Sequence, residues 1–202
     1  MYEIYNETVQ DLLIPAKKRP KTGLAIREHP KLGIYVENLS KTPVEDFEGI
    51  KRVMNQGTLN RTIGTTKMNA TSSRAHTITT IGFRQKFLHP RTGEVLNEKS
   101  SNVNLIDLAG SERLDADDHT ADRMVEGSNI NKSLMILGKC IAILAKKSTG
   151  AAVKEVVPFR ESKLTFILKQ ALGGNSRTSM IAALSPASLN FEETLSTLRY
   201  AW

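Results

Sequence analysis

The sequence predicts an α/β fold in which a mixed central sheet is flanked by helices. Residues 75–83 carry β-branched side chains on both faces, as a strand covered on both sides does. A later segment instead places apolar side chains at steps of four and three, the spacing of a helix with one apolar stripe. The stripe consists of Ile130, Leu134, Leu137, Ile141 and Leu144.

The elements before residue 75 are predicted to be short strands followed by one helix. Residues 1–13 alternate enough to form a strand with a polar extension, and the turn-prone residues 15–23 follow it. Residues 23–37 suggest short strands at the surface. Pro43 is expected to open a helix that ends near Gly57.

Strands and helices then alternate to the end of the chain. Turn chemistry at residues 89–93 joins the strand at 75–83 to a strand that ends at Asp107, as an antiparallel pair. The remaining predicted elements are the helix with the apolar stripe, a helix over 164–172, a short buried strand over 180–184 and a last helix that carries Leu195 and Leu198.

Composition narrows the class of protein. The chain has 202 residues, of which 40% are hydrophobic, and this is enough for one domain with a sizeable core. No apolar run approaches the roughly 20 residues of a membrane span, so no membrane insertion is expected. Cys140 is the single cysteine, which excludes an internal disulfide and fits a reducing cytosol.

Four motifs occur in a fixed order along the chain. A carboxylate at the end of a strand, such as Asp107, can hold a magnesium ion, and Gly110 can bring its N–H against a terminal phosphate. With the other three motifs, this one resembles the kinesin motor domain from the middle of its sheet to its last helix. The motifs span 69–76, 107–112, 129–139 and 157–176.

Three further segments look most like the third, vesicle-transporting kinesin family. They are Glu28-His29-Pro30, Tyr35-Val36-Glu37 and Ser185-Pro186-Ala187. The similarity covers essentially the whole chain.

The phosphate-binding loop of the family does not occur in this sequence. That loop has the pattern G-x-x-x-x-G-K followed by Ser or Thr, and its amides and Lys cradle the nucleotide phosphates. The resemblance therefore implies a partial kinesin-type P-loop NTPase fold, with the N-terminal strands and the P-loop absent. Residues 1–202 are expected to form a partial motor domain with switch I (69–76), switch II (107–112), the relay helix, which carries the apolar stripe, and microtubule-binding elements. The sequence leaves open whether the missing half reflects a truncation or a real loss.

The resemblance implies roles for individual residues toward ATP and Mg²⁺. Ser73 and Asp107 would hold the metal, and Gly110 would bond the γ-phosphate through its amide. The expected catalytic residues are Asn69 and Ser72, which would place the attacking water, and Arg74 and Glu112, which would pair across the two switches.

Microtubules are the expected partner. The net charge of +7 suggests an acidic partner, and no aromatic side chains alternate with the basic ones as they do on a surface that binds nucleic acid. Arg160 and Lys163 match family positions that face tubulin, and Lys146 and Lys147 lie in the adjoining loop. The expected location is the cytoplasm, on the microtubule cytoskeleton, with any dimer formed through regions outside this chain.

Three departures from the family pattern count against full activity. Ala75 stands where the family usually has Ser, and Phe166 replaces a position that is often basic. The segment 113–126, normally basic and glycine-containing, here carries a net charge of −3.

The first functional interpretation is a fragment of a kinesin-like microtubule motor. In the complete protein, ATP hydrolysis would be coupled to movement along microtubules, whereas this chain alone is not expected to turn over ATP. The alternative is a non-catalytic microtubule-binding module derived from a kinesin. An in-frame P-loop upstream would favour the motor.

Overall fold

The structure is a computed structural model that describes residues 1–31, 33–65, 74–111, 121–150 and 154–201; of residues 63–65, 121–130, 200 and 201 it describes the backbone alone. The strands are β1 (Tyr2–Tyr5), β2 (Thr8–Asp11), β3 (Ile26–His29), β4 (Gly33–Val36), β5 (His76–Leu88) and β6 (Val95–Asp107). The α-helices are α1 (Phe47–Thr65), α2 (Ala121–Ser148), α3 (Lys163–Gly173) and α4 (Phe191–Ala201), and the short 3₁₀ helices are η1 (Ala16–Lys18), η3 (Phe159–Glu161) and η4 (Ser188–Asn190). No helix among these residues is both long and apolar enough to cross a membrane.

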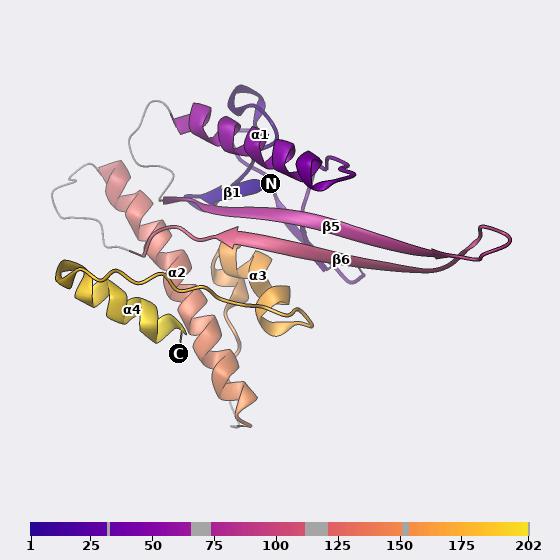
Figure 1. Cartoon of the computed structure of the whole chain (residues 1–202). Coiled ribbons are helices and arrows are strands. Elements are labelled where there is room, and N and C mark those ends of the chain that lie inside the picture. The colour runs from indigo at the N-terminus through magenta and orange to yellow at the C-terminus, as the bar shows by residue number, and fades with distance from the viewer. Residues whose placement is uncertain (32, 66–73, 112–120, 151–153, 202) are drawn as a thin grey trace.

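A four-stranded sheet in the order β2-β1-β5-β6 forms the centre of the molecule, and β3 and β4 pair separately. The predicted antiparallel pair that ends at Asp107 is confirmed, with Thr77 opposite Asp107. Within the described strands each pairing is antiparallel. Only the first residues of β5 pair with β1, and the distal part of the β5–β6 hairpin projects from the body as an arm (Figure 1).

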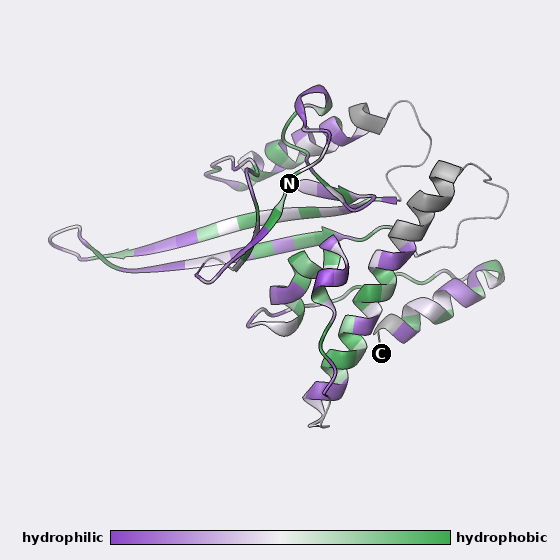
Figure 2. Cartoon of the chain, turned by 180° about the vertical axis from the view of Figure 1, so that it is seen from behind, coloured by the Kyte–Doolittle hydropathy of each residue, from purple (hydrophilic) through white to green (hydrophobic). Residues whose placement is uncertain are grey.

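Helices cover both faces of this sheet, as predicted. Tyr2, Ile4 and Ile78 lie on the face that packs against α2 and α3, and together with residues of these two helices they form the main core. Because side chains alternate along a strand, Glu3 points to the opposite face, where it meets Arg61 of α1. Figure 2 shows that α2 and α3 both contain hydrophobic stretches, and residues of both helices belong to the main core.

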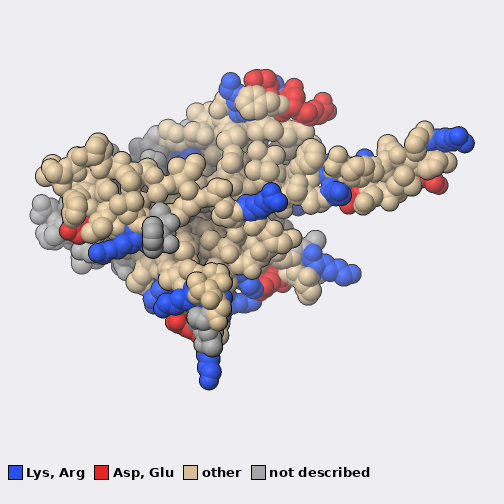
Figure 3. Space-filling model, turned by 60° about the horizontal axis from the view of Figure 1, so that its bottom comes forward, with Lys and Arg blue, Asp and Glu red and all other residues tan. Residues whose placement is uncertain are grey.

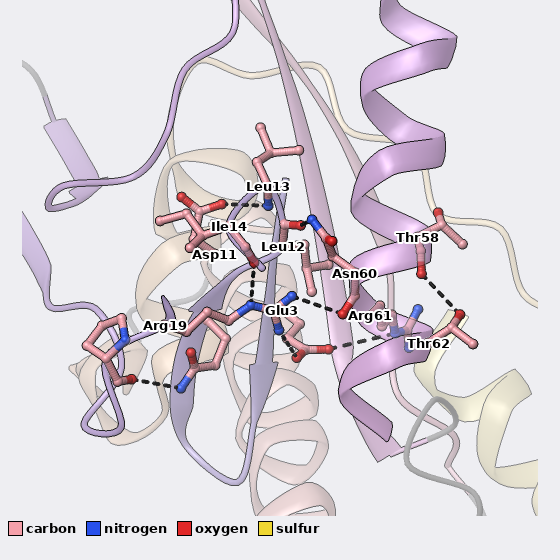
Figure 4. Close-up of polar contacts among 12 residues, drawn as sticks. Glu3, Asp11, Leu12, Leu13, Ile14, Arg19, Thr58, Asn60, Arg61 and Thr62 are labelled. Atoms are coloured by element: carbon pink, nitrogen blue, oxygen red, sulfur yellow. Dashed lines mark hydrogen bonds and ion pairs between the residues drawn. The ribbon is translucent and has the colours of Figure 1, made fainter. Parts of the chain in front are cut away.

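Polar contacts attach α1 to the first two strands (Figure 4). The Glu3 carboxylate lies 3.6 Å from Arg19 and 3.7 Å from Arg61, and burial raises its pKa against the opposing effect of the two guanidinium groups. Arg19 donates to the carbonyl of Asn60, and the Asn60 amide donates to the carbonyl of Leu12 over 2.9 Å. The C-terminal part of α1, which leads to residues 66–73, is therefore held against the sheet.

Two N-terminal predictions need correction. Residues 1–13 form a hairpin instead of one strand, because Asn6 and Glu7 adopt positive φ angles of 48° and 54° and reverse the chain. The predicted helix begins at Phe47, where Asp46 accepts a hydrogen bond from the amide of Gly49, instead of at Pro43. It continues through Gly57, where the absence of a side chain leaves room for Met1.

The predicted buried strand over 180–184 is also wrong. These residues lie outside the helices and strands, and Ile181 is 95% exposed. A strand needs a neighbour for its backbone groups, and none of the described strands pairs with this segment. The acidic segment 113–126 falls outside the residues whose side chains are described. The helices predicted over 130–144, 164–172 and around Leu195 are confirmed.

Candidate functional site

Three of the residues predicted to act on nucleotide lie within the described part of the chain. Asp107 ends β6 and is exposed, Gly110 is partly buried in the loop that follows, and Arg74 is partly buried just before β5. The other four, Asn69, Ser72, Ser73 and Glu112, lie outside the described residues. The predicted pair between Arg74 and Glu112 therefore stays a prediction.

The loop after β6 is fixed at Ala109. The Ala109 amide donates to Nδ1 of His76 over 2.9 Å, and this hydrogen bond is buried. The Ala109 side chain forms a small buried cluster with Leu134 of α2, against which Leu108 also packs. The backbone next to Gly110 is therefore attached both to β5 and to α2.

His76 joins this loop to the long helix. Its Nε2 lies 2.8 Å from the hydroxyl of Ser133 on α2, and the ring is 3% exposed. Burial lowers the pKa of His76 to about 4, so the imidazole is neutral at physiological pH. Because Nδ1 accepts from Ala109, the proton is on Nε2, which donates to Ser133.

The described residues fit part of a magnesium and phosphate site. Asp107 offers carboxylate oxygens, the ligands that Mg²⁺ prefers, and Gly110 offers a backbone N–H to a phosphate. No group of three His, Cys, Asp or Glu side chains that could hold a metal occurs within the part of the chain that the structure describes. The loop that would cradle the remaining phosphates does not occur in the sequence.

The predicted track-binding residues lie around η3, the start of α3 and the end of α2. Arg160, in η3, has a side chain that is 72% exposed, and its guanidinium stacks 4.9 Å from the ring centroid of Phe166. Lys163 begins α3, where its backbone amide donates to the Glu7 carboxylate over 2.9 Å. Lys146 and Lys147 are exposed in the last turn of α2.

An acidic residue from a distant hairpin holds two of the basic groups on this surface. Glu28 of β3 accepts from Lys169 over 2.7 Å and from Arg160 over 2.5 Å. Lys169 first, and then Arg160, holds the pKa of Glu28 below its ordinary range. The three side chains line an open cavity of about 510 Å³ with Gln170 and residues of the β3–β4 turn. In Figure 3, Lys and Arg side chains project from this lower part of the molecule.

Comparison with known proteins decides the family. The kinesin motor domain model matches residues 1–202, the whole chain. The chain belongs to the kinesin motor domain family.

Curated relatives of this kinesin chain include Kinesin-related protein 1 of Dictyostelium discoideum, which is 50% identical over 98% of the chain. Kinesin-like protein KIF1C of Homo sapiens is 51% identical over the same share. The chain spans only 9% and 18% of the lengths of these two relatives. With KIF1B and KIF13A also among the relatives, the predicted similarity to the third kinesin family is confirmed.

Solved structures agree with this assignment. A KIF14 dimer in its two-heads-bound state, with AMP-PNP and in complex with a microtubule, has a TM-score of 0.85 and 44% identity, and the match covers 99% of this kinesin chain and 55% of that one. KIF14 with ADP, also in complex with a microtubule, has a TM-score of 0.80 and 41% identity, with coverage of 99% and 56%. The kinesin fold predicted from the four motifs is confirmed.

Several residues that organise this kinesin site were not identified from the sequence as functional. His76 stands inside the first-switch motif, and its alternation with Ile78 could have indicated a buried ring on the face that packs against α2. Ser133 lies one position before Leu134 of the predicted apolar stripe. The bonding partners of Glu28 and Glu7 could not be predicted from the sequence, since they are more than 130 positions away.

Proposed function

We propose that this chain is the switch, relay and track-binding half of a kinesin motor domain, acting in the cytoplasm on the microtubule cytoskeleton. In the complete motor, ATP hydrolysis would drive movement along microtubules. The observation that carries the proposal is the attachment of the loop after β6 to α2: Ala109, beside the predicted phosphate-sensing Gly110, is bonded to His76 and packed against Leu134. A loop that senses phosphate and a helix that responds to it must be in physical contact.

Nucleotide chemistry would rest on positioning by the two switches. Bound Mg²⁺ would neutralise charge on the phosphates, with Ser73 and Asp107 as its protein ligands. Gly110 would direct its amide toward the γ-phosphate. The water-placing residues would be Asn69 and Ser72, and Arg74 with Glu112 would close the pocket, with Glu112 accepting a proton from water.

Track binding would rest on the basic surface around α3. Two of the structural relatives are in complex with a microtubule, and their similarity covers nearly all of this chain. Arg160, exposed beside Phe166, and Lys163, at the start of α3, would face tubulin, with Lys146 and Lys147 at the end of α2 extending the surface. The chain thus combines part of a predicted nucleotide site with a basic surface. This combination supports the proposal that it is a fragment of a motor.

Co-sedimentation of residues 1–202 with microtubules across a salt series tests track binding. We expect binding that weakens as salt rises, because exposed charges are screened beyond about 8 Å at physiological ionic strength. Arg160→Ala with Lys163→Ala should weaken it strongly. The matched control is Arg84→Ala with Lys86→Ala, which removes the same charge from the β5–β6 arm. Equal losses in the two double variants would contradict a specific surface.

Phosphate release by the purified chain tests the nucleotide half of the proposal. We expect none above background, with or without microtubules, because Asp107 and Gly110 do not replace the phosphate-binding loop. Release that Gly110→Ala abolishes would contradict this expectation.

A further inference from the structure

His76 is the one described histidine whose two ring nitrogens both have buried partners on other elements. Nδ1 accepts from the backbone of Ala109, in the loop after β6, and Nε2 donates to Ser133 of α2. The ring itself belongs to the first residue of β5. A single side chain therefore connects β5, the loop after β6 and α2.

The imidazole ring fixes the geometry of its two hydrogen bonds relative to each other. The ring is planar and its nitrogens are fixed relative to each other, so the Ala109 amide and the Ser133 hydroxyl are held at a set separation. The bond from Ala109 requires the Nε2–H tautomer, and this tautomer is the one that can donate to Ser133. Both contacts are buried, where a polar group left without a partner is strongly disfavoured.

Packing reinforces the same connection. The Ala109 methyl group and Leu134 are both buried in one small cluster, and Leu134 is next to Ser133 in the sequence. The loop therefore contacts α2 through apolar atoms directly and through the imidazole indirectly. Gly110 follows Ala109 immediately, so its amide cannot move far without changing this junction.

We propose that His76 is a positioning residue that makes the loop at Ala109 and Gly110 move together with α2. The linkage itself is a property of this chain. Only its use, which is to transmit movement in a motor, rests on the proposed function. A displacement at Gly110 would reach α2 through the rigid ring, and a displacement of α2 would reach Gly110 by the same path. This coupling is reciprocal by thermodynamic necessity.

Two variants of His76 separate its two contacts. Asn places an oxygen near the position of Nδ1, so His76→Asn keeps an acceptor for Ala109 and removes the donor to Ser133. Gln places an amide nitrogen near the position of Nε2, so His76→Gln keeps a donor to Ser133 and removes the acceptor for Ala109. Ser133→Ala removes the contact on α2 without touching the ring. His89→Asn is the control, because His89 also accepts backbone hydrogen bonds through Nδ1 but lies in the exposed turn of the arm.

Amide hydrogen exchange by NMR on the 202-residue chain provides the measurement. We expect Ser133→Ala to raise exchange at Ala109 on the order of tenfold relative to Leu12 of the N-terminal hairpin, the factor that loss of one ordinary hydrogen bond gives. His76→Gln should do the same, and so should His76→Asn, because it also loses the contact with Ser133 although it keeps an acceptor for Ala109; His89→Asn should not. Dividing by the exchange rate at Leu12 removes any uniform loss of stability, which a merely structural role would produce.

The wild-type chain supplies a second readout that does not depend on how the variants fold. The ring nitrogen shifts and couplings of His76 should show the Nε2–H tautomer. An Nδ1–H ring, or unchanged relative exchange at Ala109 in Ser133→Ala, would overturn the proposal. Failure of the chain to bind microtubules would contradict the proposed function instead, and the exchange data would still decide the linkage.

Discussion

His76 and Glu28 show how far one side chain can determine the properties of this chain. Of the other two described histidines, His29 is exposed and His89 is partly buried, whereas His76 is enclosed by β5, the loop after β6 and α2. Glu28 lies at the surface but bonds two cations from α3 and η3. His76 determines how β5, the loop after β6 and α2 are joined. Glu28 determines how much positive charge the proposed track surface presents.

The pH dependence of stability should carry the signature of His76. In the unfolded chain its pKa returns to the ordinary value of 6.5, while burial holds it at about 4 in the fold. Between these values only the unfolded chain takes up the proton, so stability falls as pH drops through this window, by about 3 kcal/mol in full. His76→Asn should lose that part of the slope, as denaturant unfolding at pH 7 and pH 4.5 would show. Parallel pH profiles would contradict the assignment.

Neutralising Glu28 should strengthen microtubule binding. Glu28→Gln releases Lys169 and Arg160 from an intramolecular carboxylate, so both become available to an acidic filament. The gain should be largest at low salt. Glu37→Gln is the matched control, since Glu37 pairs with Arg27 on the same hairpin and its loss changes the net charge equally. If both variants bind equally well, net charge alone explains the effect.

The places of the residues predicted to act on nucleotide were easier to predict than their connections. Asp107 ends β6, as the sequence predicts, and Gly110 lies in the loop that follows, whereas their roles toward nucleotide stay predictions. The roles of His76, Ser133 and Glu28 depend on partners 33 to 141 positions away, and local patterns hold no information about such pairs.

Element boundaries depend on caps and close contacts as well as on periodicity. The helix α1 begins after Asp46, whose carboxylate accepts from the amide of Gly49 over 2.6 Å, and this cap outweighs the Pro43 signal. Gly57 does not end α1, and its missing side chain instead leaves room for Met1. The strand at 75–83 was predictable from its β-branched residues, the strand ending at Asp107 from the turn before it, and the helix with the apolar stripe from its strong periodicity.

Removing the α1 cap should destabilise the fold modestly. Asp46→Ala should lower the free energy of unfolding by about 1 kcal/mol, since it leaves a helix N-terminal amide without its partner. Glu45→Ala removes the same charge one position earlier and should have a much smaller effect. Chemical denaturation of both variants makes the comparison. A larger loss for Glu45→Ala would place the cap elsewhere.

At the scale of the whole molecule, the sheet has an open side. The strand β6 is the outer strand of the described sheet, with Val103 and Leu105 about half exposed at 52% and 49%. An exposed apolar edge strand presents unpaired backbone groups to other chains. Residues 180–184, which the sequence predicted as a strand, lie outside the sheet and are largely exposed.

The isolated chain should therefore be marginally stable and prone to associate through β6. Val103→Lys with Leu105→Lys should reduce association, because charges on an edge strand oppose pairing between chains. Light scattering against concentration makes the comparison, with Val156→Lys as a control at an exposed position away from the sheet. A dilute wild-type monomer that unfolds cooperatively at high temperature would contradict this prediction.

The long-range contacts of the β1–β2 hairpin also affect how the chain folds while it is being synthesised. Its turn residue Glu7 bonds the amide of Lys163, 156 positions later, and Tyr2 pairs with Ile78. At ordinary translation speeds, Lys163 emerges from the ribosome roughly 8 to 30 s after Glu7. The apolar surface of β1 and β2 therefore stays exposed until their partner residues have been synthesised. Contacts between residues so far apart in the sequence form slowly.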